Sequence, residues 1–430
     1  MKKTLHKAPL MLFSDNNGDI FEEPDYQLAV REGNNITVPD ADVFIELPEG
    51  SDMFMLPGRF GYGKNIKTGK IELINKGFAV ASFISPAYTQ IYLAAYKAEK
   101  DAPRLPLYAY TAVGWVDGKF YVPAIRIDSD IRQDCSQFDQ EIVIRNAKIK
   151  CAEKSENRLI KHLSNCALTY FCPAARNYFL KRWEAPLPTS PSCNAQCVGC
   201  ISYQPKKHKI SPTQHRITFV PTPEEIAKIA IEHLETASNP IVSFGQGCEG
   251  EPLTVWKIIE QSIKLIRKKT GKGIINLNTN ASKPEAIDIL AKAGLDSIRV
   301  SMNSVREKYY NAYFNPVGYS FTNVIESIRI MRAYNKWVSL NYFVFPGFTD
   351  SIEEYETLLE FLNHNKPNML QWRNMNIDTD WYLEILKDSF INQETIGVLD
   401  MISNIKQKFP KIYHGYFNPG KKIQRKYGLT

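Results

Sequence analysis

The chain has 430 residues, of which 44% are hydrophobic, 23% charged and 12% aromatic, and its formal net charge is +7. This composition is typical of a packed globular protein of two or three domains, and it excludes the disordered, collagen-like and low-complexity classes. Eight cysteines are too dilute for a disulfide-framework miniprotein, but four of them fall between positions 172 and 200.

The first 165 residues are expected to form a β-rich domain. Short β-type runs separated by turn residues occur at residues 35–38, 43–47, 70–74 and 141–144. The clearest hairpin spans residues 113–122, because Asp117-Gly118 supplies the two positive φ angles of a tight turn. We find no catalytic motif and no internal repeat here, so we interpret this region as a separate domain that recognises a substrate. Residues 166–182 then form a cysteine-containing linker.

From residue 183 to residue 408, strands are predicted to alternate with helices. The clearest helix start is Thr222-Pro223-Glu224-Glu225, which combines an N-cap threonine, a proline in the first turn and a capping-box glutamate. Gly294 is expected to end a later helix. The predicted strands cover residues 183–187, 241–244, 274–277, 297–301, 338–344 and 369–372. Further helices are predicted over residues 254–269, 283–292, 322–334, 352–362 and 394–408.

This alternation predicts the α/β fold class. Strands that alternate with helices form a parallel sheet with right-handed crossovers. A complete eight-unit barrel usually needs about 250 residues, so six units over this length favour a partial (β/α)6 barrel. In such barrels the active site lies at the C-terminal ends of the strands. Residues 409–430 are interpreted as a basic C-terminal tail.

Three cysteines follow the first predicted barrel strand in the pattern Cys-x3-Cys-x2-Cys. They are Cys193, Cys197 and Cys200. Three thiolates at this spacing hold three irons of one [4Fe–4S] cluster and leave the fourth iron without a ligand from the motif. An open position of this kind distinguishes a reactive metal centre from a closed structural one. The motif therefore predicts a reactive iron–sulfur cluster.

The cysteine motif resembles that of the radical S-adenosylmethionine (SAM) superfamily, and the resemblance extends over about residues 183–408. It implies a partial barrel of the radical SAM type and a [4Fe–4S] cluster whose free iron chelates the amino and carboxylate groups of SAM. One electron then cleaves SAM to methionine and a 5′-deoxyadenosyl radical, which abstracts a hydrogen atom from a substrate. The family usually has an aromatic or bulky residue before the third cysteine, where this chain has Gly199.

Other segments resemble the family at successive predicted strand ends. Residues 249–253 are similar to the Gly-Gly-Glu-Pro motif that holds the SAM amino group, with Glu249 in place of the first glycine. Residues 278–280 resemble a Thr-Asn turn of the family, and residues 346–350 resemble a loop found in many members. The residues that the resemblance assigns to SAM binding are Gly250, Glu251, Pro252, Asn278, Ser301, Asn303 and Asn341. The end of the sixth strand, expected to face SAM or substrate, carries Arg373, Asn374 and Asn376.

The other cysteines allow three interpretations. Cys166 and Cys172 are candidates for an auxiliary iron–sulfur cluster, together with one or two further cysteines. Cys248 lies beside the SAM-like motif in the sequence and is a candidate catalytic residue. Alternatively, these thiols are ordinary buried core residues.

We therefore expect a radical SAM enzyme acting on an unidentified substrate such as a peptide, a protein or an RNA, with a low-potential electron donor such as a ferredoxin or a flavodoxin. One alternative is a radical SAM enzyme that acts on a small metabolite, with the N-terminal domain as a lid. An alternative of another class is a non-catalytic iron–sulfur or zinc module that binds nucleic acid through two basic stretches without acids, residues 201–223 and 415–430. A zinc site in that module would combine Cys197, Cys200, His208 and His215, at spacings outside the usual pattern.

The sequence also predicts the compartment. The N-terminal residues lack the apolar core of a secretory signal, and no stretch is apolar enough to span a membrane. We therefore expect a cytoplasmic protein, without a membrane partner, whose thiols stay reduced.

Overall fold

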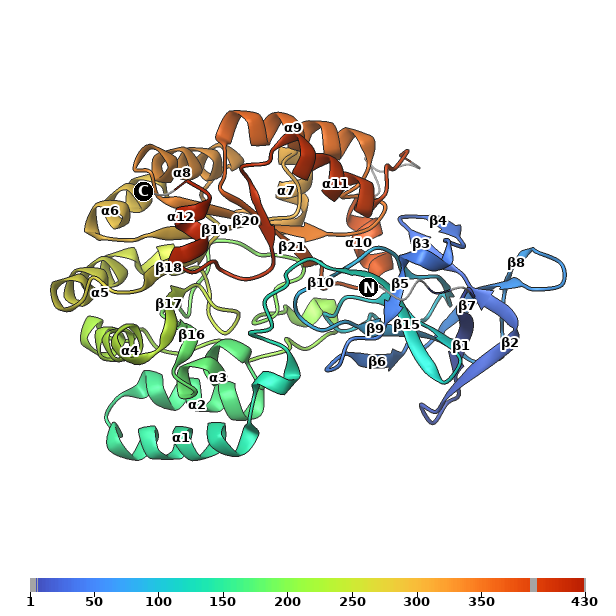
Figure 1. Cartoon of the computed structure of the whole chain (residues 1–430), viewed down its shortest axis with the longest axis horizontal. Coiled ribbons are helices and arrows are strands. Elements are labelled where there is room, and N and C mark those ends of the chain that lie inside the picture. Colours follow the sequence, from blue (N-terminus) through green and yellow to red (C-terminus); the bar gives the residue numbers. More distant parts are fainter. Residues whose placement is uncertain (1–4, 6, 387–392, 429–430) are drawn as a thin grey trace.

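The computed structural model describes residues 5, 7–386 and 393–428, and it contains a β-rich part beside a parallel sheet covered by helices (Figure 1). The β-rich part is an antiparallel assembly with small hydrophobic cores of its own, and its residues Leu93 and Leu107 also belong to the large core of the parallel sheet. Its strands are β1 (Leu10–Ser14), β2 (Ile20–Leu28), β3 (Val30–Glu32), β4 (Asn35–Thr37), β5 (Phe44–Glu46), β6 (Asp52–Met55), β7 (Arg59–Asn65), β8 (Ile71–Leu73), β9 (Phe78–Phe83), β10 (Tyr88–Gln90), β11 (Leu93–Ala94), β12 (Tyr96–Ala98), β13 (Thr111–Ala112), β14 (Gly114–Val116) and β15 (Lys119–Arg126).

Most of the predicted N-terminal strands are confirmed. The runs at residues 35–38, 43–47 and 70–74 form β4, β5 and β8. The predicted hairpin joins β14 to β15, and its turn residues Asp117 and Gly118 have φ angles of 46° and 85°. Two consecutive positive φ angles are what a tight hairpin turn requires.

The strand expected at residues 141–144 is wrong, because these residues lie in a helix. Three helices connect the β-rich part to the parallel sheet: α1 (Gln140–Glu153), α2 (Arg158–Thr169) and α3 (Pro173–Phe179). The Asp139 side chain accepts a hydrogen bond from the backbone N–H of Ile142 and so caps α1. Residues Val143, Ala147 and Lys150 form its buried face at helical spacing. These helices pack into the core of the parallel sheet, so the segment expected to be a linker is mostly helical.

The second half of the chain is a parallel sheet with strand order β16-β17-β18-β19-β20-β21-β22. The six predicted strands are confirmed as β16 (Arg182–Pro186), β17 (Ser238–Phe244), β18 (Ile274–Thr279), β19 (Ser297–Met302), β20 (Trp337–Val344) and β21 (Met369–Asn374). The seventh strand, β22 (Tyr413–Gly415), pairs with β21. The segment expected to be a tail therefore extends the sheet, and it ends in α12 (Lys421–Lys426).

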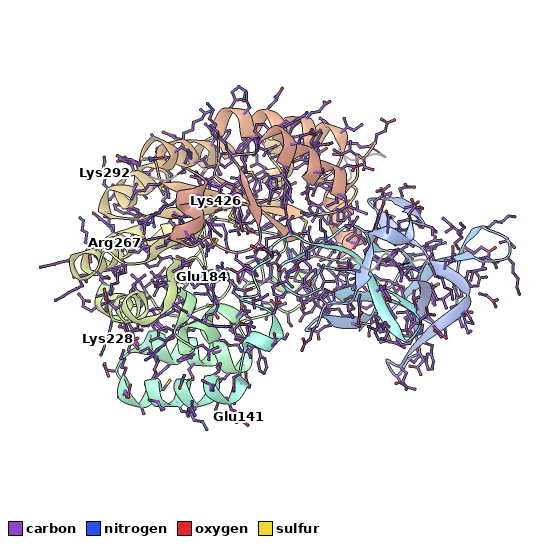
Figure 2. The ribbon with its side chains drawn as sticks, viewed as in Figure 1. Glu141, Glu184, Lys228, Arg267, Lys292 and Lys426 are labelled. Carbon is purple, nitrogen blue, oxygen red and sulfur yellow. The ribbon has the colours of Figure 1, made fainter. Side chains whose placement is uncertain are left out.

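Helices cover the outer side of this sheet and complete the partial barrel (Figure 1). They are α4 (Pro223–Thr236), α5 (Trp256–Lys269), α6 (Pro284–Ala293), α8 (Phe321–Ala333), α9 (Ile352–Asn365) and α11 (Val398–Lys408). Two more helices, α7 (Glu307–Phe314) and α10 (Thr379–Leu386), contact each other, and α10 lies next to the β-rich part, where its Asp380 pairs with Arg31. The predicted capping box at Thr222 and Glu225 begins α4, and Gly294 ends α6 with a φ of 115°. Charged side chains such as Lys228, Arg267 and Lys292 project from the outer helices (Figure 2). No helix in the described ranges combines the length and the apolar character needed to cross a membrane.

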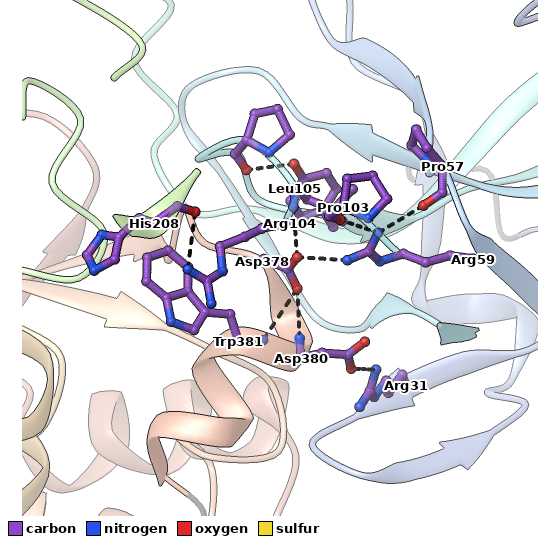
Figure 3. Close-up of polar contacts among 12 residues, drawn as sticks. Arg31, Pro57, Arg59, Pro103, Arg104, Leu105, His208, Asp378, Asp380 and Trp381 are labelled. Carbon is purple, nitrogen blue, oxygen red and sulfur yellow. Dashed lines mark hydrogen bonds and ion pairs between the residues drawn. The ribbon is translucent and has the colours of Figure 1, made fainter. Parts of the chain in front are cut away.

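The β-rich part covers the C-terminal ends of the barrel strands. The N–H of Gly33 donates to the carbonyl of Pro346, after β20, and the N–H of Gln90 donates to the Asn374 side chain at the end of β21. Beyond β21, Arg59 pairs with Asp378 at 2.8 Å, and the two side chains are 3% and 2% exposed (Figure 3). Since one charge of a buried pair left alone is costly, this ion pair fixes the two parts against each other.

Replacing Arg59 by methionine tests this junction. Arg59→Met leaves the Asp378 carboxylate buried without its cation, so we expect the free energy of unfolding to fall by about 3–5 kcal/mol. The matched control is Lys119→Met, which removes an exposed pair with Glu46 and is expected to cost at most about 1 kcal/mol. Both values come from denaturant unfolding, and equal losses in the two variants would contradict the role of the buried pair.

Candidate active site

A cavity of about 360 Å³ lies at the C-terminal ends of the barrel strands, within the usual size range of small-molecule sites. Phe83 and Ile84, at the end of β9, line the cavity from the β-rich part. Both parts of the chain therefore form its wall. The barrel residues that line it include Cys193, Cys197, Cys200, Arg216, Gly250, Glu251, Pro252, Asn278, Arg299, Ser301, Tyr313, Asn341, Arg373, Asn374, Asn376 and Tyr416.

The three cysteines of the motif all reach this cavity from the loop after β16. Burial raises the pKa of the Cys193 thiol to about 11 and also raises the pKa of Cys197. A buried thiolate is costly without a compensating positive charge, and bound iron supplies that charge. Arg216 Nη2 donates a hydrogen bond to Cys200 Sγ at 3.5 Å, which adds a fixed positive charge beside the thiols. These residues fit an anionic iron–sulfur cluster.

The spacing of the thiols favours a cluster over a single metal ion. The sulfur atoms of Cys193, Cys197 and Cys200 do not all lie within 4.8 Å of one another. Sulfur ligands of one tetrahedral zinc ion stand about 3.8 Å apart, whereas the three thiolates of this motif bind three different irons. The predicted zinc site is not formed either, because His208 contacts Gln204 and Trp381, and His215 contacts Tyr170.

Glu249 braces the loop that carries the cysteines. The carboxylate is 4% exposed and accepts five hydrogen bonds. One oxygen binds the N–H and hydroxyl of Thr189 and the N–H of Ser190, just before the cysteine motif. The other binds the N–H groups of Gly245 and Gln246, after β17. The glutamate that replaces the family's first glycine thus joins the cluster loop to the SAM-like motif.

Gly250 leaves no room for a side chain. An added Cβ would lie 1.9 Å from the Ser192 carbonyl oxygen, so residue 250 must be glycine for the two loops to approach this closely. The N–H of Gly250 donates to the Ser190 carbonyl at 2.6 Å, and the N–H of Glu251 donates to the Ser192 carbonyl at 2.9 Å. These contacts place Glu251 next to the cysteine loop.

Glu251 presents a buried carboxylate to the cavity. It accepts hydrogen bonds from the Thr279 hydroxyl at 2.5 Å and from the N–H groups of Asn280 and Leu253 at 2.8 and 3.0 Å. Burial raises the pKa of Glu251 to about 7. A carboxylate has about four acceptor sites, so one remains for a cation in the cavity.

Polar groups from four neighbouring strands face the same cavity. Arg299 of β19 and Arg373 of β21 each have a buried Nε without a hydrogen-bond partner. Burial, and then the charge of Arg373, lowers the pKa of Arg299 to about 10. Asn278 and Asn341 also have one buried amide atom each without a partner. Since buried polar atoms are nearly always hydrogen-bonded, these four side chains are arranged for a polar ligand with a negative charge.

Tyr313 of α7 occupies the space beside Gly199. A Cβ added at Gly199 would lie 2.5 Å from the Tyr313 hydroxyl oxygen, and the tyrosine also lines the cavity. The aromatic ring that the motif lacks in sequence is thus supplied from a distant helix. Six residues that line the cavity were not predicted from the sequence: Phe83, Ile84, Arg216, Arg299, Tyr313 and Tyr416. Of these, only the two arginines carry a signal in the sequence, because a positive charge can bind an anionic ligand.

Two predicted site residues do not reach the cavity. Asn303 is fully buried, and its amide nitrogen donates to the Tyr309 carbonyl and the Tyr382 hydroxyl. Cys248 is buried beside Cys166 and His162 of α2. Neither of them lines this cavity in the structure.

Comparison with known proteins agrees with this geometry. The model of the radical SAM superfamily matches residues 187–362, from the end of β16 into α9. Residues 187–362 thus match a radical SAM domain. Its match to an uncharacterized protein of Methanocaldococcus jannaschii has 22% identity over 173 residues, which is 39% of this chain and 38% of that protein. The chain thus spans less than half the length of this curated relative.

The solved structures that this chain matches include several radical SAM enzymes. Methylornithine synthase has 15% sequence identity and a TM-score of 0.38, over 63% of this chain and 68% of that chain. SuiB of Streptococcus suis, bound to its precursor peptide SuiA, has 13% identity and a TM-score of 0.39, over 64% and 65%. A radical SAM methyltransferase from Sphaerobacter thermophilus has 15% identity and a TM-score of 0.33, over 48% and 63%.

Replacing Glu249 by glutamine tests how the loop with the cysteines is held in place. In Glu249→Gln, the amide NH2 faces at least two N–H donors that the carboxylate had satisfied, and each unsatisfied buried donor costs about 1–3 kcal/mol. We therefore expect a loss of at least about 2 kcal/mol in unfolding free energy and reduced iron retention. Glu260→Gln on the outer face of α5 is the control. Iron content and stability equal to those of the control would show that the loop needs no such brace.

Proposed function

We propose that the protein is a radical SAM enzyme that cleaves SAM reductively and abstracts a hydrogen atom from a substrate. One observation carries this proposal: three thiols and the Glu251 carboxylate, held on two loops of a radical SAM domain, face one cavity. Each of these groups alone is common in proteins, whereas their convergence at the strand ends of a partial barrel is specific.

In this proposal Cys193, Cys197 and Cys200 would hold the cluster, and the cluster would supply the electron for reductive cleavage of SAM. Glu251 binds the SAM ammonium group with its remaining acceptor site. Arg299 and Arg373 balance the SAM carboxylate, and Asn278, Ser301 and Asn341 orient the rest of the molecule. Gly250 and Pro252 shape the loop that brings Glu251 to the cysteines.

The β-rich part supports a role in enclosing the substrate. Phe83 and Ile84 place apolar side chains on the cavity wall opposite the barrel strands. Exclusion of water protects a carbon radical from side reactions. We propose that the substrate, a peptide, a protein, an RNA or a small metabolite, enters between the two parts. A low-potential donor such as a ferredoxin or a flavodoxin then supplies electrons, which suits the cytoplasm, where thiols stay reduced.

Two alternatives from the sequence stay predictions outside this proposal. A second iron–sulfur cluster at Cys166 and Cys172 would give about eight irons per chain instead of the about four expected for a single cluster. The nucleic-acid-binding alternative has support in exposed Lys206, Lys207 and Lys209. Arg216, however, points into the cavity and binds Cys200, so the basic loop partly serves the cluster site.

The direct test is 5′-deoxyadenosine formation by anaerobically reconstituted protein with dithionite and SAM. We expect about four irons per chain and product formation in the full chain, and product at background level in Cys197→Ala, because one iron loses its ligand. Cys151→Ala, a half-buried thiol outside the site, is the control and keeps full activity. SAM cleavage retained in Cys197→Ala would contradict the assignment of Cys193, Cys197 and Cys200 as the cluster ligands.

SAM affinity is expected to depend on pH through Glu251. Its pKa of about 7 lies above the ordinary glutamate value, so the carboxylate that binds the ammonium group is lost as the pH falls through 7. The dissociation constant for SAM, measured by equilibrium dialysis, should rise about tenfold from the plateau to one pH unit below 7. In Glu251→Gln affinity is weak at all pH values and the profile is flat. An unchanged profile in this variant would place the ammonium site elsewhere.

A further inference from the structure

A second group of metal-binding side chains lies outside the active-site cavity. The donor atoms of His162, Cys166 and Cys248 all lie within 4.8 Å of one another. In the part of the chain that the structure describes, no other group of three His, Cys, Asp or Glu side chains has its donor atoms this close together. Cys166 and Cys248 are 1% and 4% exposed, and His162 is half-buried. The sequence motif of the active site uses none of the three.

The fold brings these residues together from two elements. His162 and Cys166 are four residues apart in α2, so they lie on the same helix face. Cys248 comes from the loop after β17, one residue before Glu249. The Cys166 sulfur lies 3.5 Å from His162 Nε2.

The geometry suits one tetrahedral metal ion. With usual zinc–sulfur and zinc–nitrogen bond lengths, the sulfur and nitrogen ligands of one zinc stand about 3.6 Å apart, which matches the observed 3.5 Å. A larger cluster, in which each thiolate binds a different iron, needs wider separations than this group offers. A dithiol alone would account for the two cysteines but not for the imidazole nitrogen placed beside them.

We infer that His162, Cys166 and Cys248 bind one zinc ion, which joins helix α2 to the loop after β17. Two thiolates and an imidazole are three of the ligands that zinc prefers, and the fourth position is left to water or to a neighbouring group. The ion holds this loop from the side of α2, while Glu249 holds the same loop from the side of Thr189 and Ser190. Zinc thereby supports the segment that presents Glu251. The inference is independent of the proposed reaction.

The test is zinc binding to the full chain after reconstitution of the iron–sulfur cluster. Elemental analysis after removal of free metal is expected to give about one zinc per chain for the unmodified protein and for the control Cys151→Ser. Competition with a chromophoric chelator should show that Cys248→Ser and His162→Ala each weaken zinc binding by more than about 100-fold. Loss of a residue that only hydrogen-bonds to a zinc ligand typically weakens binding by about 10- to 100-fold, so a larger effect indicates a direct ligand. Cobalt(II) in place of zinc should give thiolate-to-cobalt charge transfer and the intense bands of a tetrahedral site, both absent in Cys248→Ser.

Two further measurements distinguish the loss of a zinc ligand from misfolding of a variant and from the loss of SAM cleavage. The same zinc titration on Cys193→Ala/Cys197→Ala/Cys200→Ala, which lacks the cluster ligands, should still give one zinc. Zinc should also raise the melting temperature of the unmodified chain but not that of His162→Ala. Zinc uptake equal in all variants, no uptake at all, or a Cys166–Cys248 disulfide found by mass spectrometry in anaerobically prepared protein would each overturn the inference.

Discussion

The buried carboxylate of Glu249 is the constraint on which the site depends. A charge in a protein interior is stable only when its oxygens are hydrogen-bonded, and here five donors from two loops meet that need. Because neither loop can move without leaving Glu249 or its donors unsatisfied, the two loops hold each other. The cysteines after β16 and Glu251 after β17 are thereby held in fixed positions relative to each other. Rigid groups of this kind lose less conformational freedom when a ligand binds.

A second buried charge sets the position of the β-rich part. Arg59 and Asp378 fix it over the strand ends, and the side chain of Arg104 stacks on Trp381 nearby at 4.0 Å (Figure 3). Phe83 and Ile84 line the cavity from the β-rich part. The contacts that stabilise the junction of the two parts therefore also hold these two residues at the site.

Much of the barrel could be predicted from the sequence, because strands and helices in it have strong periodicity and clear caps. Helix α4 shows this, with the capping box of Thr222 and Glu225 and its regular apolar face. Helix α1 is harder to predict, because the β-branched residues at 142–144 favour a strand whereas the Asp139 cap favours a helix. Strand β22 is only three residues long and is defined by pairing with β21, which no local pattern reveals.

The residues of the site also fall into those that the sequence predicts and those that it does not. Cysteine spacing and the Glu251-Pro252 pair are local signals, so the triad and the SAM-like motif were found. Tyr313 beside Gly199, and His162 beside Cys248, depend on contacts between distant segments, and a single sequence contains no signal for them. Asn303 was assigned to SAM by resemblance, but the structure turns it toward Tyr309 and Tyr382 instead.

The proposed function requires a cluster that is held by three thiols and has one iron open for SAM beside Glu251. Electron paramagnetic resonance of the reduced protein, recorded with and without SAM labelled with ¹⁵N at its amino group, tests this arrangement. We expect SAM to change the cluster spectrum and the ¹⁵N nucleus to show hyperfine coupling to the cluster, weakened in Glu251→Gln. A reduced cluster whose spectrum is the same with and without SAM would show that SAM does not bind at the open iron.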